Sequence, residues 1–149
     1  LTSLLGFLRE ELGRREVSIA LTLTESQPKV LADDNQLRQV LLNLIRNAAE
    51  AMADQPASER TLTIGSRLLT IGPSEKPGIA VDIIDNGPGI PKERQRQVFE
   101  PFFTTKKGGT GLGLALSLEV ISRHGGKLLL KSPLGDSGGT CFTVELPTT

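Results

Sequence analysis

The order of strands and helices is the feature that most constrains the fold of this chain. Alternating apolar residues predict strands at 17–24, 61–69, 79–85, 127–131 and 140–146. Helical spacing predicts an opening helix at 1–12 that Gly13 ends, helices at 33–52 and 112–124, and a short polar helix at 92–99. Some strands are joined by helices and others by turns, so a regular strand–helix–strand alternation is absent. We therefore expect a two-layer α/β sandwich, a mixed sheet of about five strands with about three helices on one face, which leaves a gap for a ligand.

Size and composition favour one domain. The 149 residues suit a single domain spanning 1–149, and because the chain starts inside a helical pattern without Met we expect it to be part of a longer protein. Seventeen basic and seventeen acidic residues cancel, so no global field attracts nucleic acid or an anionic membrane surface. The single cysteine, Cys141, excludes a disulfide framework and favours a cytoplasmic location. No apolar run approaches the roughly 18 residues that span a bilayer.

Two asparagines on the predicted helix 33–52 are the first candidate ligands. Asn43 and Asn47 are four residues apart and so share one helix face beside the apolar stripe. One interpretation is that both are surface residues bonded to loop backbone. The other is that their amide oxygens face a hard cation such as Mg²⁺, which also keeps water and phosphate ligands.

A second candidate site directly follows the predicted strand 79–85. Asp85 precedes Asn86, Gly87, Pro88 and Gly89, a composition typical of a turn. The same residues would also let a flat ligand lie against the backbone. Asp85 could then accept a hydrogen bond from an exocyclic amine, and Ile90 could offer an apolar face.

Glycines are concentrated in the second half of the chain, with eleven of the sixteen between Gly87 and Gly139. The segment 106–113 begins with two lysines and leads through four glycines into the predicted helix 112–124. Backbone amides at a helix N-terminus favour phosphate, although the segment could also be only a flexible loop. Its spacing matches neither the dinucleotide fingerprint nor the P-loop.

Together these segments resemble the Bergerat-fold (GHKL) ATPases, and among them the ATP-binding catalytic domain of two-component sensor histidine kinases. The resemblance extends from about Leu1 to Leu146. Its motifs, in the family's order, are the N box with Asn43 and Asn47, the D-x-G-x-G box at 85–90, the F box at 99–103, the second glycine box at 111–114 and a final G-x-T-like motif at 138–140. The family's fold implies a mobile ATP lid, here at about 91–110.

The resemblance implies ATP and Mg²⁺ as cofactors and assigns roles to residues. Asn47 would bind Mg²⁺, Asn43 would belong to the metal and phosphate network, and Asp85 would accept from the adenine amine with Thr140 nearby. Lys106 or Lys107 would reach the γ-phosphate, unless both lie on a solvated lid. The remaining nucleotide contacts would be Gly87, Gly89, Ile90, Phe102, Thr110, Gly111, Leu112, Gly113 and Leu114.

The implied activity is transfer of the ATP γ-phosphate to a histidine on a separate dimerisation domain, followed by transfer to a response regulator. Two alternatives stay open: a hydrolytic ATPase of the MutL or chaperone type, and a nucleotide-binding switch without transfer activity. The hydrolytic relatives carry Glu where this chain has Asn43. Glu50 stands where many of these kinases have a basic residue, and only seven residues separate Phe103 from Gly111, so the lid is short. We expect His124, the only histidine, to end a helix and not to accept phosphate.

Overall fold

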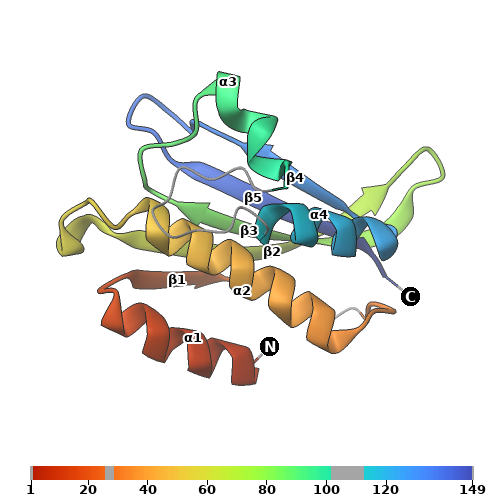
Figure 1. Ribbon diagram of the computed structural model, residues 1–149. Helices are drawn as coiled ribbons and strands as arrows, with labels where there is room; N and C mark the ends of the chain where they lie inside the picture. The colour runs from red at the N-terminus through yellow and green to blue at the C-terminus, as the bar shows by residue number, and fades with distance from the viewer. Residues whose placement is uncertain (1, 26–28, 102–112, 149) are drawn as a thin grey trace.

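The computed structural model describes residues 2–25, 29–101 and 113–148 (Figure 1). Four α-helices alternate irregularly with five strands, and two short 3-10 helices, η1 and η2, lie between them. In chain order the elements are α1 (Thr2–Arg14), β1 (Ser18–Thr22), α2 (Asp34–Ala51), η1 (Ala57–Glu59), β2 (Thr61–Ile71), β3 (Lys76–Asp85), α3 (Lys92–Gln95), η2 (Gln97–Phe99), α4 (Gly113–Arg123), β4 (Lys127–Lys131) and β5 (Thr140–Pro147).

The strands form a single mixed sheet. Its order is β1-β2-β3-β5-β4, with β1 parallel to β2 and the other neighbours antiparallel. The longer helices pack on one side: Figure 1 shows α2 and α4 in front of the strands and α1 below the edge strand β1. The predicted two-layer sandwich is confirmed.

The core lies between α2 and the helix-facing side of the sheet. Leu44 of α2 and Leu62 of β2 are fully buried, and Ile83 and Phe142 are 1% exposed. The apolar stripe of α2 that meets the sheet consists of Val40, Leu44, Ile45, Ala48 and Ala49. Burial of this broad stripe is what makes the helical periodicity so clear in the sequence.

Helix α2 begins where the sequence predicts. Asp33 is its N-cap, and its Oδ1 accepts the backbone N–H of Gln36 at 3.0 Å. This bond satisfies one of the amides that the first turn leaves without a helical partner. The start of the helix that carries both asparagines is therefore fixed.

Helix α1 ends later than its glycine suggests. The helix continues through Gly13 to Arg14, and the residue in the left-handed region is Glu16, with φ 56°. The N–H of Val17 bonds the carbonyl of Leu12 at 3.0 Å, the long bond of a Schellman ending. The prediction that Gly13 ends the helix was wrong, because this ending uses a glutamate where glycine is usual.

The β2–β3 hairpin is longer than predicted. Both strands extend beyond the expected bounds, because Ile71 pairs with Lys76 and Leu69 pairs with Gly78. The turn is thereby reduced to the residues around Gly72, whose φ is +73°.

In the part of the chain that the structure describes, no helix has both the length and the apolar character needed to cross a membrane.

Candidate functional site

Asp85 ends β3 with its side chain on the helix-facing side of the sheet. The residue is 4% exposed, and its Oδ1 accepts the backbone N–H of Gly87 at 2.8 Å. Directly opposite on β5 lies Thr140, 3% exposed. A buried carboxylate and a buried hydroxyl therefore lie side by side at the end of the sheet.

The neighbouring Asn86 has a structural role. Its side-chain Oδ1 accepts the N–H of Thr61 at 3.1 Å, and its Nδ2 donates to the carbonyl of Glu59 at 2.6 Å. The local turn contact of this segment is made by Asp85, whose Oδ1 accepts the N–H of Gly87 two residues on. Asn86 instead connects the segment to η1 and to the start of β2.

Glycines let two loops pack backbone to backbone beside Asp85. The N–H of Gly139 donates to the carbonyl of Gly87 at 2.8 Å. A Cβ at Gly138, where φ is +96°, would lie 2.7 Å from the carbonyl oxygen of Pro88. A side chain at Gly138 would therefore push the D-x-G-x-G segment away from the loop before β5.

A row of residues along α2 connects the predicted motifs. Asn43, Asn47 and Ala51 are spaced by four and share a helix face, over about 12 Å of helix. At one end, a Cβ at Gly113 would lie 4.0 Å from Cγ of Asn43; at the other, a Cβ at Gly87 would lie 3.1 Å from the carbonyl oxygen of Ala51. This row thus extends from the N-terminus of α4 to the loop after Asp85.

A cavity of about 860 Å³ opens at the Asp85 end of this row. Its walls come from the end of α2 and the loop after it, the end of β3 with its glycine loop, and the turn between β4 and β5. The lining includes Ala51, Asp85, Gly87, Leu134 and Gly139. Polar and apolar groups thus converge where the loop after Asp85 meets the turn between β4 and β5.

One arginine fixes the wall formed by the loop after α2. The guanidinium of Arg60 donates to the carbonyls of Arg15 at 2.7 Å, Ala53 at 2.9 Å and Gln55 at 3.0 Å. Three charge-assisted hydrogen bonds from one side chain to backbone carbonyls therefore hold this loop in place. The sequence carries no local signal for the role, because Arg60 lies in a polar stretch.

Ser132 is a second residue of this region whose role the sequence analysis missed. Its Oγ accepts the N–H of Ile90 at 2.7 Å, donates to the carbonyl of Gly139 at 2.9 Å and lies 3.0 Å from Oγ1 of Thr140. Gln95 of α3 donates from Nε2 to the carbonyls of Ile90, at 3.0 Å, and Ser132, at 2.6 Å. Next to Pro133, Ser132 looks like an ordinary turn residue.

The other predicted site residues divide into two groups. Ile90 and Leu114 are half-buried against the core, and Gly89, with φ +87°, would bring a Cβ to 3.2 Å from Oγ of Ser132. The ring of Phe99 meets Phe142 edge to face, with centroids 6.2 Å apart. The remaining predicted contacts lie outside the described residues: Phe102, Lys106, Lys107, Thr110, Gly111 and Leu112.

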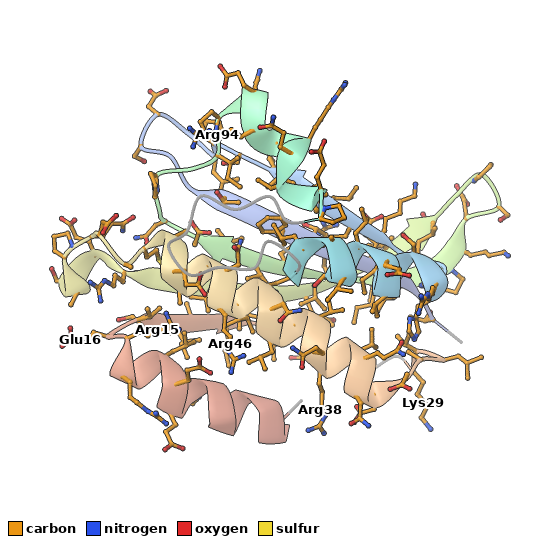
Figure 2. All side chains as sticks on the ribbon, viewed as in Figure 1. Arg15, Glu16, Lys29, Arg38, Arg46 and Arg94 are labelled. Atoms are coloured by element: carbon orange, nitrogen blue, oxygen red, sulfur yellow. The ribbon has the colours of Figure 1, made fainter. Side chains whose placement is uncertain are left out.

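Two charged residues, Arg46 and Glu50, lie near the N box on α2. Arg46 donates from Nε to Oε1 of Glu11 at 3.1 Å and so links α2 to α1. Figure 2 shows Arg46 between these two helices. Glu50 is exposed. Within the ranges that the structure describes, no group of three or more His, Cys, Asp or Glu residues could hold a metal ion.

Three titratable groups with shifted pKa values lie on the opposite face of the sheet. Burial alone would raise the pKa of Asp82, but hydrogen bonds from Arg67 and Thr143 and the charge of Arg67 lower the pKa below its ordinary value. The hydrogen bond to Asp82 in turn raises the pKa of Arg67. Burial raises the pKa of the Cys141 thiol. This cluster connects β2, β3 and β5 and lies on the face of the sheet away from α2.

Comparison with known proteins shows the family to which the chain belongs. Residues 32–149 match the family model described as histidine kinase-, DNA gyrase B-, and HSP90-like ATPase. The sensory histidine kinase/phosphatase NtrB of Rhizobium leguminosarum bv. phaseoli is 41% identical over 139 residues, 89% of this chain and 36% of that protein. The sensor protein TdiS of Thauera aromatica is 38% identical over 143 residues, 96% of this chain and 25% of that protein.

Solved structures give the same result. The catalytic domain of histidine kinase ThkA superposes with a TM-score of 0.80 at 30% sequence identity, covering 99% of this chain and 91% of that one. The chain therefore belongs to the family of histidine kinase-, DNA gyrase B- and HSP90-like ATPases and is homologous to the nucleotide-binding catalytic domains of sensor histidine kinases. It spans about a quarter to a third of the curated relatives named above.

Proposed function

We propose that this domain binds ATP with Mg²⁺ and transfers the γ-phosphate to a histidine on a separate dimerisation domain. The observation that carries the proposal is the row of Asn43, Asn47 and Ala51. One end of the row lies against Gly113, at the N-terminus of an 11-residue helix, and the other lies against Gly87. A helix N-terminus favours phosphate. The opposite end holds a buried carboxylate for an amine, so base and phosphates each have a complementary end.

At the end of the site that binds the base, the carboxylate of Asp85 accepts a hydrogen bond from the exocyclic amine of adenine. Its carboxylate is held by the N–H of Gly87, and this bond leaves the side chain little freedom to turn away. Gly87 and Gly89 have no side chains, so the base can approach their backbone closely, and Ile90 supplies an apolar surface. A charge-assisted hydrogen bond of this kind contributes roughly 1.5–3 kcal/mol.

At the phosphate end, the chain's donor set fits a magnesium ion that is held mainly by phosphates. Asn47 and Asn43 supply amide oxygens, which Mg²⁺ accepts, and Oδ1 of Asn43 now accepts from Nε2 of Gln39 at 3.1 Å. When bound, the ion neutralises phosphate charge. The chain's own residues position the nucleotide, and positioning is the main protein contribution to phosphoryl transfer.

The contacts expected from Phe102, Lys106, Lys107, Thr110, Gly111 and Leu112 belong to the same proposal. Because Glu50 cannot balance phosphate charge, we assign this role to Lys106 or Lys107 together with the amides of Gly111 and Gly113. Lys106 is the residue that we expect to reach the γ-phosphate.

The partners follow from the proposed reaction. The acceptor histidine lies on a dimerisation domain outside this chain, and a response regulator then receives the phosphate in the cytoplasm. A solved structure of the histidine kinase ThkA contains its response regulator TrrA, which supports a partner of this kind. That structure matches this chain with a TM-score of 0.76 at 27% identity.

Asn43 favours transfer over hydrolysis. A carboxamide does not take a proton from water at neutral pH, so it cannot replace the Glu that hydrolytic relatives carry at this position. A switch module without transfer activity would bind the same nucleotide and needs a functional test.

The test is phosphate transfer in trans. The chain is incubated with γ-labelled ATP, Mg²⁺ and a helical dimerisation domain from the same full-length protein. We expect acid-labile label on the dimerisation domain, and loss of most of it with Asn47→Asp, which places one additional negative charge beside the phosphates. Nucleotide binding without label on the partner would support the switch alternative.

A further inference from the structure

Ser132 has a buried side-chain hydroxyl to which the proposed function assigns no role. It directly follows β4, is 8% exposed and contacts three groups. The first is the N–H of Ile90, which can only donate. The second is the carbonyl of Gly139, which can only accept. The third is the hydroxyl of Thr140, which can do either.

Counting protons assigns the direction of the third bond. A serine hydroxyl has one proton to donate and two lone pairs with which to accept. Its proton goes to the carbonyl of Gly139, and one lone pair takes the N–H of Ile90. All three bonds form together only when Thr140 donates its own proton to the remaining lone pair of Ser132, over 3.0 Å.

This direction changes what Thr140 offers a ligand. With its proton held by Ser132, Oγ1 of Thr140 can only accept. Thr140 is the register partner of Asp85, and side chains directly opposite on antiparallel strands lie about 4.5–5.5 Å apart at Cβ. An ionised carboxylate also only accepts, so the pair presents two acceptors side by side.

We propose that Ser132 sets the base preference of the site by holding the hydroxyl proton of Thr140, so that Thr140 and Asp85 both accept from the purine amine, directly or through one water. Adenine carries a donor amine at its six-position. A six-oxo purine has a carbonyl at this position. The carbonyl would face two acceptors and would have no hydrogen-bond donor. Ser132 is a positioning residue in this account, because it acts through Thr140. The inference rests on the proposed binding of ATP at Asp85.

Gln95 provides a matched control. It donates to the carbonyls of Ile90 and Ser132, at 3.0 and 2.6 Å, and so supports the same two segments. It does not bond the hydroxyl of Ser132 or Thr140. Gln95→Ala therefore loosens the same region without changing the direction of the Thr140 proton.

The experiment compares ATP with purine riboside triphosphate, the same nucleotide without the amine. Both are titrated calorimetrically into the wild-type chain, Ser132→Ala and Gln95→Ala. We expect Ser132→Ala to reduce the preference for ATP about threefold to tenfold, the value of one hydrogen bond. Gln95→Ala should weaken both nucleotides by the same factor and keep the preference. A Ser132→Ala protein with the wild-type preference overturns the inference.

Thr140 gives a second, independent test that leaves Ser132 in place. Thr140→Val removes the acceptor and should lower the ATP preference as Ser132→Ala does, whereas Thr140→Ser keeps the hydroxyl and should retain it. An unchanged preference in Thr140→Val overturns the inference even if Ser132→Ala does not fold. A wild-type chain that binds neither nucleotide contradicts the proposed function itself, which separates the two failures.

Discussion

His124 links the end of α4 to the start of α2 through Asp33. Its Nε2 accepts the backbone N–H of Asp33 at 3.1 Å, and its Nδ1 lies 2.7 Å from the carbonyl oxygen of Val120. Since a carbonyl only accepts, Nδ1 carries the proton and the ring is in one tautomer. Both ring nitrogens are thus engaged in holding two helices together.

The role of His124 predicts that the chain alone does not become phosphorylated. A phosphoacceptor needs a nitrogen lone pair directed at ATP, and the lone pair of His124 faces the N-cap of α2. The measurement is incubation with γ-labelled ATP without a partner domain, with His124→Ala as control. Acid-labile label that appears in the wild type and disappears in the variant would contradict this assignment.

Asn43 predicts slow hydrolysis. General-base assistance contributes about 10²- to 10⁴-fold in rate, and the carboxamide of Asn43 cannot supply it. We expect Asn43→Ala to weaken nucleotide binding with little further effect on turnover. A steady-state assay of phosphate release at saturating Mg·ATP checks both points. Turnover near 1 s⁻¹ or above, within the ordinary enzyme range, would favour the hydrolytic alternative.

The ion pair on the outer face of the sheet predicts a pH-dependent stability. Nε of Arg67 donates to Oδ2 of Asp82 at 3.0 Å, and Thr143 donates to Oδ1 at 2.6 Å. Because folding lowers the pKa of Asp82 below 3.8, its contribution is present above about pH 4 and is lost as the pH falls through the folded value. Asp82→Asn should lower Tm by about 2–4 °C at pH 7, for about 1 kcal/mol, and the difference should shrink below pH 4.

A matched control for this prediction is Glu10→Gln. Glu10 pairs with Arg14 at 3.5 Å, but the two side chains are 73% and 76% exposed. Solvent screens such a pair almost completely, so Tm should not change. A constant difference between wild type and Asp82→Asn from pH 7 to pH 3, measured by thermal denaturation, would show that the carboxylate charge is not what stabilises the sheet.

The ending of α1 predicts a stabilising substitution. Glu16, labelled in Figure 2, has φ 56°, a conformation that costs an L-residue about 1–2 kcal/mol. Glu16→Gly should raise the free energy of unfolding by about 0.5–1 kcal/mol, after the greater freedom of glycine in the unfolded chain is subtracted. Gly125, φ +75°, ends α4 in the same way, so Gly125→Ala should have the opposite effect. Urea denaturation of both variants measures this; a destabilised Glu16→Gly would contradict it.

Local patterns were enough to predict most of the fold. The stripe of α2, its cap at Asp33 and the alternating strands repeat within a few residues, so their periods are visible in the sequence. The predicted end of α1 was wrong because the residue in the left-handed conformation is Glu16, and glutamate is not a residue type that indicates a helix end. The length of the β2–β3 hairpin was underestimated because strand pairing continues as far as Ile71 and Lys76, beyond the apolar run that begins at Ile79.

Part of the candidate site could be proposed from the sequence because its motifs match a known family in order. For Asn43, Asp85 and the glycines, the residues alone left surface, turn and flexible-loop interpretations open, and their roles stay predictions. Ser132 was missed because its function depends on partners such as Ile90, which is 42 residues away in the chain. The Asp33 contact of His124 spans 91 residues and was likewise hidden, although the helix-end role itself was anticipated.

The most direct test of the account is a calorimetric titration of Mg·ATP into the wild-type chain and into Asp85→Asn. Asparagine keeps the size of the side chain and its bond to Gly87, but replaces the charged acceptor that we assign to the adenine amine. We predict that the wild type binds and that affinity in the variant falls about 10- to 100-fold, as expected for a charge-assisted hydrogen bond. Equal affinities in the two proteins would contradict the placement of adenine at Asp85 and, with it, the site as described.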